Sequence, residues 1–234
     1  MKLLAVITAR GGSKRIPHKN IRPFNGKPIL AYSIQAALES NLFNEVMVST
    51  DDAEIARIAK AWGAKVPFMR SAENANDTAT TVQALLEVVQ EYEKQGKTFE
   101  TLCCIYPTAP FVTARRLQQA CALMTESVDS VMPVTAYGFP PQRAMIIKEG
   151  CLKYQYPEYQ NARSQDLLRV YHDCGQFYFC RVESLISNKS LVGPRTVPIV
   201  VDEIEAQDID SEADWKLAEL KYRLVQEEQS LEAE

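Results

Sequence analysis

The sequence predicts an α/β protein in which a mainly parallel sheet lies between two layers of helices. Short apolar runs of strand length alternate along the chain with stretches whose apolar residues recur at helical spacing. The first run, Leu3–Thr8, is apolar almost throughout, as is typical of a parallel strand buried on both faces. With 234 residues, 46% of them hydrophobic, the chain can bury a full core without disulfides or structural metals. These observations favour a three-layer α/β architecture with helical crossovers.

The first helix is predicted after a glycine-rich turn that follows the first strand. Pro28 suits the first helical position, and Leu30 and Ile34 fall on one apolar face with Ala37. The next predicted strands are residues 45–50, 65–68, 101–106 and 130–135. Apolar stripes at helical spacing separate them at residues 55–62, 78–94 and 117–124. Because each stripe follows a strand, the pattern indicates repeated crossover units.

The alternation of strands and helices predicted for the preceding residues stops between residues 136 and 173. Glycine and several prolines divide this segment into short pieces, and residues 144–148 and 151–154 have the pattern of a hairpin. We therefore predict a single domain over residues 1–234 with an insertion at about 136–173. The insertion is expected to cover a substrate or to pair with a second subunit, and a surface excursion without function is the alternative.

The chain then returns to the sheet and ends in a helix. Residues 175–180 and 196–201 are predicted strands, and Ser211 is placed to cap the final helix. That helix is expected to contain Trp215, Leu217, Leu220 and Leu224.

Composition and charge exclude several classes of protein. The formal net charge is −4, so no general electrostatic attraction to nucleic acid or to an anionic membrane is expected. No apolar stretch reaches the length needed to span a bilayer, which predicts a soluble protein. The six cysteines form no Cys-x-x-Cys pair and no zinc pattern, so we expect reduced core residues and a cytoplasmic location.

A basic loop with the sequence ITARGGSKRIPHKN follows the first strand. Gly11 and Gly12 allow successive amide groups to point at one anion. Positive and amide side chains surround that position at Arg10, Lys14, Arg15, Lys19 and Asn20. The spacing fits neither a Walker loop nor a dinucleotide fingerprint. Since ligands of α/β sheets bind at the carboxyl ends of strands, we predict a phosphate-binding loop, with an ordinary solvated turn as the alternative.

Two carboxylates stand near the other end of the chain. Asp208 and Asp210 alternate with Ile209, so both point to the same side of an extended segment. Such a pair can hold Mg²⁺, whose remaining ligands are water and substrate phosphates. The alternative is a helix N-terminus, where acidic residues are favoured. A phosphate-binding loop elsewhere in the chain makes the metal interpretation the better one.

Two further segments supply candidates for ligand contacts. Residues 73–81 are rich in hydroxyl and amide groups, and Asp77 or Thr78 either caps the following helix or takes part in nucleoside recognition. Tyr106 begins a proline-stiffened turn at the carboxyl end of a predicted strand, so it faces the same edge of the sheet.

Five motifs together resemble one enzyme family. They are ARGGSKRIPHKN, DDAEIA, AENANDTATT, YPTAPF and QDIDSEADW, in this order from the first strand to the last helix. This series resembles the nonulosonic acid cytidylyltransferases, which activate sialic-type sugars with CTP. The resemblance implies a Rossmann-like nucleotidyltransferase fold with a small dimerisation insertion, and hence a homodimer.

The activity that the resemblance implies is transfer of cytidylate from CTP to the anomeric hydroxyl of an acidic nine-carbon sugar. Pyrophosphate then leaves with Mg²⁺ neutralising its charge, and positioned cations supply most of the catalysis. From the family motifs, Arg10, Ser13, Lys19 and Asn20 are expected to contact the phosphates and the ribose or base of CTP, and Lys14 is a further phosphate candidate. The loop residues Gly11 and Gly12, and Asp77 and Thr78 near the nucleoside, complete the predicted contacts with CTP. The expected catalytic residues are Arg10, Lys19, Asp208 and Asp210. Asp208 and Asp210 are expected to hold the metal.

The sugar implied by the resemblance is pseudaminic acid. Residues 161–167 and 171–178 are similar to the pseudaminic acid branch of the family. Tyr106 stands where sialic acid synthetases usually carry glutamine, and His172-Asp173-Cys174-Gly175 stands where they carry Arg-x-Asn-Gly. N-acetylneuraminate and 3-deoxy-manno-octulosonate are the alternative substrates, and a nucleotide-binding scaffold without activity is the alternative outside enzymes.

The sugar carboxylate needs a positive or amide partner. The candidates are Arg163, Gln165 and His172, with Arg163 favoured by its bidentate geometry. Gln176, Phe177 and Tyr178 are expected to line the pocket wall. The general base is open between metal-bound hydroxide and an aspartate, because a lone histidine such as His18 is more often structural.

Overall fold

A central sheet organises the protein, as shown by a computed structural model that describes residues 2–232 and side chains as far as residue 228. Within that part of the chain the sheet has seven strands, in the order β11-β6-β10-β5-β1-β4, with β9 paired to β6. Its strands are β1 (Leu3–Thr8), β4 (Glu45–Ser49), β5 (Thr101–Ile105), β6 (Ser130–Ala136), β9 (Tyr171–Asp173), β10 (Phe177–Arg181) and β11 (Thr196–Val200).

Most neighbouring strands in this sheet are parallel. β1 pairs in parallel with both β4 and β5, and β6 pairs in parallel with β11. β10 lies between β5 and β6 and is antiparallel to both. The carboxyl ends of β1, β4, β5, β6 and β11 therefore meet at one edge of the sheet, together with the amino end of β10. The mainly parallel α/β sheet predicted from the sequence is confirmed, whereas the reversed direction of β10 was not predicted.

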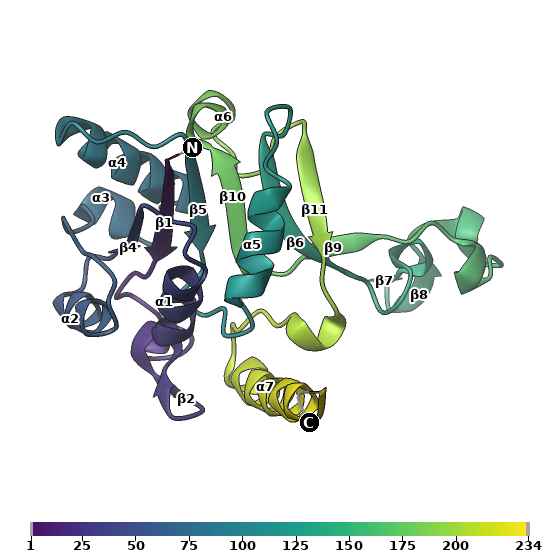
Figure 1. Cartoon of the computed structure of the whole chain (residues 1–234). Helices are drawn as coiled ribbons and strands as arrows, with labels where there is room; N and C mark the ends of the chain where they lie inside the picture. The colour runs from purple at the N-terminus through teal and green to yellow at the C-terminus, as the bar shows by residue number, and fades with distance from the viewer. Residues whose placement is uncertain (1, 233–234) are drawn as a thin grey trace.

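Helices cover both faces of the sheet, because alternate residues of each strand face opposite sides. Leu3, Ala5 and Ile7 of β1 pack in one core cluster with α1 (Ile29–Glu39), α2 (Ala53–Ala61) and α5 (Ala114–Ala122). Leu4 and Val6 face the other cluster, which includes side chains of α4 (Thr81–Lys94) and α6 (Val182–Asn188). Figure 1 shows these layers. The remaining elements are α3 (Ala72–Ala75), α7 (Glu212–Glu232) and the hairpins β2 (Pro23–Phe24) with β3 (Lys27–Pro28) and β7 (Met145–Lys148) with β8 (Cys151–Tyr154).

Helix α7 lies beyond the carboxyl ends of the strands, at the bottom of Figure 1. Trp215 and Ala218 are buried against Ile16 and Phe24 in a separate core cluster that includes Ile209. The helix contains the four apolar residues predicted for it, but half or nearly half of the surface of Leu217, Leu220 and Leu224 is exposed. The buried face instead follows Trp215 and Ala218 toward Tyr222 and Val225, which restores helical spacing. This packing sets the position of residues 208–210, which immediately precede the helix.

The segment between β6 and β9 projects away from the body of the molecule, at the right of Figure 1. We call residues 136–173 the arm. β7 and β8 form its antiparallel hairpin, as predicted, with Ile147 paired to Leu152. Several of its large apolar side chains are mostly exposed, among them Phe139, Ile147, Leu152 and Leu168.

Three local predictions require correction. Residues 65–68 form no strand, because only Lys65 bridges to Met47 and Pro67 cannot donate a backbone hydrogen bond. Helix α4 begins later than predicted, since Thr80 and Gln83 form a capping box ahead of Thr81. Pro28 is the residue before α1 and lies in its hairpin rather than in the first helical position.

The cysteines are all unpaired, and Cys103, Cys104, Cys174 and Cys180 are buried. Cys151 on the arm is exposed. No helix among residues 2–232 combines the length and the apolarity that crossing a membrane requires.

Candidate active site

A cavity of about 660 Å³ opens at the edge of the sheet where the strands end. Four segments that are distant in the sequence supply its walls: the basic loop after β1, the segment around α3, the turn after β5 and the residues before α7. The residues singled out from the sequence that line it are Arg10, Ser13, Lys14, Arg15, Lys19, Asn20, Asp77, Tyr106, Asp208 and Asp210. The fold therefore places the basic loop and the two carboxylates around the same space.

The basic loop is held in shape by contacts beneath it. Gly11 lies so close to α2 that a Cβ there would be 2.8 Å from Asp52 Oδ2, so a larger residue would collide. The Gly11 amide donates to Asp51 Oδ1 at 2.9 Å, and the buried Asn20 side chain donates to the Arg10 carbonyl at 2.8 Å. At Gly12, by contrast, no atom lies within 4 Å of the position that a Cβ would take. These contacts fix the backbone of the loop, and its long basic side chains line the cavity.

Two cations of the loop contact the acidic segment. Lys19 Nζ donates to the Ile209 carbonyl at 2.5 Å and lies 3.6 Å from Asp210 Oδ1. Arg15 reaches the same carboxylate oxygen at 2.7 Å. Burial lowers the pKa of Lys19, and the charges of Asp210 and Asp208 oppose this effect. The two ends of the chain thus meet through opposite charges.

The two carboxylates have the character of a cation site. Burial raises the pKa of Asp208, and the nearby charge of Asp210 raises it further. A cation between the two groups would relieve both effects. Among the described residues, no group of three or more histidine, cysteine, aspartate or glutamate side chains is arranged to hold a metal. Two carboxylates completed by substrate oxygens are nevertheless a common set for Mg²⁺, so the residues present fit that ion.

Asp77 faces the basic loop rather than the start of α4. Its carboxylate pairs with Arg10 at 3.1 Å and also with Lys14. The hydrogen bond and charge of Lys14 lower the pKa of Asp77. The amides of Thr78 and Ala79 are instead satisfied by Asn76 Oδ1. Thr78 is not among the residues that line this cavity.

Arg70 lines the cavity although the sequence did not single it out. The side chain is buried, and it donates from Nε to Ser49 Oγ at 3.0 Å and from its NH2 group to the Ser49 carbonyl at 2.7 Å. Burial lowers its pKa. No carboxylate of the described residues forms a salt bridge with it. No local sequence pattern distinguishes this arginine from a surface one. Its position in the cavity depends on its contacts with Ser49 of β4, which is distant in the sequence.

The residues expected to contact the sugar are divided between two places. Tyr106 lines the cavity, and its ring lies 5.4 Å from that of Tyr178. Gln176 is buried nearby and donates to the Glu205 carbonyl at 2.5 Å. The other candidates lie on or at the base of the arm, outside this cavity: His172 on β9, and Arg163 and Gln165 in the outer part of the arm. Arg163 is mostly exposed and pairs with Asp166 at 2.8 Å.

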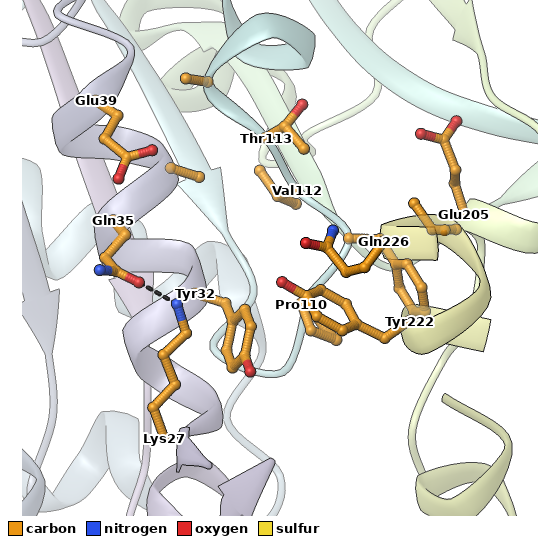
Figure 2. A pocket seen from close by; sticks show the side chains of 14 residues that line it. Lys27, Tyr32, Gln35, Glu39, Pro110, Val112, Thr113, Glu205, Tyr222 and Gln226 are labelled. Carbon is orange, nitrogen blue, oxygen red and sulfur yellow. Dashed lines mark hydrogen bonds between the residues drawn. The ribbon is translucent and has the colours of Figure 1, made fainter. Parts of the chain in front are cut away.

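A second cavity, of about 180 Å³, lies between α1, the turn after β5 and α7. Figure 2 shows Lys27 and Gln35 of the α1 side facing Tyr222 and Gln226 of α7, with Pro110 between them. None of the residues predicted to bind nucleotide, metal or sugar lines it. The 660 Å³ cavity, lined by most of the predicted nucleotide-binding residues and by both predicted metal ligands, is therefore the candidate active site.

Comparisons with known proteins identify the family to which the chain belongs. A family model described as cytidylyltransferase matches residues 4–177. The chain is 36% identical to a pseudaminic acid cytidylyltransferase of Campylobacter jejuni, over 97% of this chain and 99% of that one. It is 33% identical to a CMP-N,N'-diacetyllegionaminic acid synthase of Legionella pneumophila, over 97% and 99%.

Among solved structures, one of CMP:2-keto-3-deoxy-manno-octonic acid synthetase complexed with CTP is similar, with a TM-score of 0.69 and 19% identity. The match covers 97% of this chain and 100% of that one. This likeness confirms the α/β nucleotidyltransferase fold. With the family match and the full-length relatives, it shows that this chain is a nucleotidyltransferase and belongs to the cytidylyltransferase family.

Proposed function

We propose that the protein transfers CMP from CTP to the anomeric hydroxyl of a nine-carbon 2-keto acid sugar, pseudaminic acid, and releases pyrophosphate. One observation carries the proposal: the cationic loop and the Asp208–Asp210 pair line one cavity, although they come from opposite ends of the chain. The full-length relatives named for pseudaminic and legionaminic acid support a nonulosonic acid as the acceptor.

The reaction forms a bond between the sugar oxygen and the α-phosphorus of CTP, and it breaks the bond from that phosphorus to the oxygen bridging to the β-phosphate. Arg10, Lys14, Arg15 and Lys19 are proposed to bind the phosphates, exchanging carboxylate partners for phosphate oxygens. Asp208 and Asp210 are the residues that would hold Mg²⁺. That ion, when bound, supplies positive charge for the departing pyrophosphate. Since negative charge grows on the leaving oxygens, prearranged cations lower the barrier.

The nucleoside is proposed to lie toward Arg70 and the start of α4. Arg70 offers a buried guanidinium, and the cytosine edge presents acceptor atoms that match such a donor. Thr80 and Thr81 line the same region and supply hydroxyl groups for the ribose or base. Asn20 is proposed to help bind the nucleotide indirectly. Its side chain donates to the Arg10 carbonyl and so holds the basic loop in position. Thr78 keeps its proposed nucleoside role only if residues 76–79 move on binding.

The arm is proposed to mediate a homodimer. Phe139, Ile147, Leu152 and Leu168 expose between 68% and 88% of their surface, which is costly for a monomer in water. Pairing of two arms would cover these side chains. It would also explain why Arg163 and Gln165, proposed sugar contacts, lie away from the cavity of their own chain. We also propose a cytoplasmic location, since the cysteines of the protein are unpaired.

The substrate proposal is tested with purified protein, CTP and Mg²⁺. Pseudaminic acid, N-acetylneuraminate and 3-deoxy-manno-octulosonate are supplied in separate reactions, and pyrophosphate release is measured. The highest kcat/KM is expected for pseudaminic acid. A clear preference for either other sugar would overturn the substrate assignment, and no pyrophosphate with any of them would favour a nucleotide-binding scaffold.

A further inference from the structure

Asp173 touches the wall of the candidate active site through a buried tyrosine. The Tyr178 hydroxyl donates to Asp173 Oδ2 at 2.6 Å, and Tyr178 is almost completely buried. Its ring lies against that of Tyr106, which lines the cavity. An exposed carboxylate is thus connected to the cavity wall through a buried phenol and a ring contact.

The other oxygen of Asp173 fixes the turn between β9 and β10. Asp173 Oδ1 accepts from the Gly175 amide at 2.8 Å, and Gly175 has a φ of +62°, which favours glycine. A Cβ at Gly175 would stand 3.6 Å from Asp208 Cγ, so the turn packs beside the acidic pair. The next residue accepts from the Tyr106 amide through its carbonyl, with Gln176 O and Tyr106 N 2.8 Å apart. One carboxylate therefore sets both the backbone turn and the phenol behind Tyr106.

The hydrogen bond to Asp173 also holds the ring of Tyr178. A phenol has a single proton, and that of Tyr178 is donated to Asp173. The rings of Tyr178 and Tyr106 lie 5.4 Å apart with an interplanar angle of 54°, so the position of Tyr178 limits where the Tyr106 ring can lie. Because Tyr106 lines the cavity, its placement sets the shape of the wall that a substrate meets.

We propose that Asp173 is a positioning residue for the acceptor sugar, acting through Tyr178 to fix the ring of Tyr106 in the cavity wall. This inference rests on the proposed function, since it assigns the Tyr106 end of the cavity to the sugar. It assigns Asp173 no contact with either substrate. The phosphate-binding loop lies on other elements, so CTP binding is not expected to depend on Asp173.

The test compares Asp173→Asn, Tyr178→Phe and the double variant with the unchanged protein. Asp173→Asn keeps the size of the side chain but replaces one acceptor oxygen by a donor, and Tyr178→Phe keeps the ring and removes the link. Each single variant is expected to raise the KM for the sugar about tenfold, the loss of one buried hydrogen bond to a charged group. The affinity for CTP, measured by calorimetry without sugar, should stay within about twofold.

The double variant is expected to be no worse than either single variant, because both remove the same interaction. Asp202→Asn, an exposed aspartate on another segment, serves as the matched control. An unchanged sugar KM in both single variants would overturn the inference. So would CTP affinity and melting temperature falling in parallel with the sugar KM, since that result indicates a general structural role.

Failure of the inference can be told apart from failure of the proposed function. If the unchanged protein releases pyrophosphate with a nonulosonic acid while the variants behave as it does, only the role of Asp173 is wrong. If the unchanged protein releases none with any sugar of the panel, the proposed function itself is wrong. Where Asp173→Asn fails to fold, Tyr178→Phe alone decides, because its ring still fills the core.

Discussion

The side-chain nitrogen of Lys19 lies 3.6 Å from Asp210 Oδ1 and donates to the carbonyl of the intervening Ile209 at 2.5 Å. This contact joins the loop after the first strand to the segment before the last helix. Because Ile209 is completely buried beside Ile16 and Trp215, the contact is set by core packing. The geometry of the candidate site therefore depends on how α7 docks.

Replacement of Asp210 by asparagine is expected to reduce kcat about a hundredfold or more, since a carboxylate proposed to hold the metal becomes neutral. The size of the side chain is retained, so the circular dichroism spectrum and the melting temperature should change little. Pyrophosphate release measures the rate, and Asp202→Asn is the control. A rate equal to that of the unchanged protein would exclude a role for Asp210 in metal binding.

Replacement of Asp77 by asparagine is expected to tighten CTP binding. Asp77 pairs with Arg10 and Lys14, the same cations that are proposed to bind phosphate, so its charge competes with the triphosphate. These groups are largely exposed, and the gain in affinity should be only about two- to fivefold and should shrink as salt is added. Glu73→Gln in the same segment is the control. Weaker CTP binding would instead show that Asp77 is needed to place the two cations.

Replacement of Gly11 by alanine is expected to weaken CTP binding about tenfold, equivalent to about 1.4 kcal/mol. The new Cβ would meet Asp52 Oδ2 at 2.8 Å, and Asp52 is the residue that caps α2, so the loop must shift. Gly12→Ala is the matched comparison, because no atom lies within 4 Å of a Cβ there. The dissociation constants are measured by calorimetry. Equal losses in the two variants would contradict the proposed close contact.

The ion pair between Asp129 and Arg195 is expected to make stability depend on pH. The Arg195 guanidinium, 2.6 Å away, lowers the pKa of Asp129, so the folded-state pKa lies below the unfolded value. Its contribution to stability is therefore full above the unfolded pKa of about 3.9 and is lost as the pH falls through the folded pKa. The melting temperature of Asp129→Asn should lie below that of the unchanged protein at pH 7, and the gap should close in acid. A gap independent of pH would refute this account.

Charging the hairpin of the arm is expected to separate the proposed dimer. Ile147 and Leu152 are cross-strand partners and expose 77% and 68% of their surface. Lysine at both positions would place two charges in the paired surface, where each uncompensated charge is costly. Light scattering after gel filtration gives the mass, and Ile186→Lys on α6, whose side chain is 48% exposed, is the control. A monomer before any substitution, or a dimer after it, would contradict the role proposed for the arm.

Much of the sheet was predictable because its signals are local. The strands at residues 3–8, 45–50, 101–106, 130–135 and 196–201 correspond to β1, β4, β5, β6 and β11 within one residue at each end. Each is a short apolar run bounded by turn residues, and such a run can bury both faces only inside a sheet. The hairpin of the arm was equally predictable, because two short strand-like segments flank a turn at residues 149–150. The two charged motifs also stood out, since clustered cations and paired acids need no distant partner to be noticed.

Other features were decided by contacts between distant residues. Residues 65–68 were apolar enough for a strand, yet Pro67 and the edge of the sheet left only one bridge at Lys65. The direction of β10 depends on where the arm brings the chain back to the sheet, and no local sequence pattern predicts that point. Arg70 enters the cavity only because Ser49 of the neighbouring strand holds its guanidinium.

The sequence by itself determined the kinds of element, their order and the chemistry of the charged loop and the acidic pair, because hydrophobic period and residue type act over a few neighbouring positions. Only the tertiary structure decided which polar and charged groups meet: Lys19 and Arg15 with Asp210, Arg10 and Lys14 with Asp77, and Tyr178 with Asp173. Those pairings follow from the strand order and from the docking of α7, which are selected by burial of the whole core rather than by any one segment.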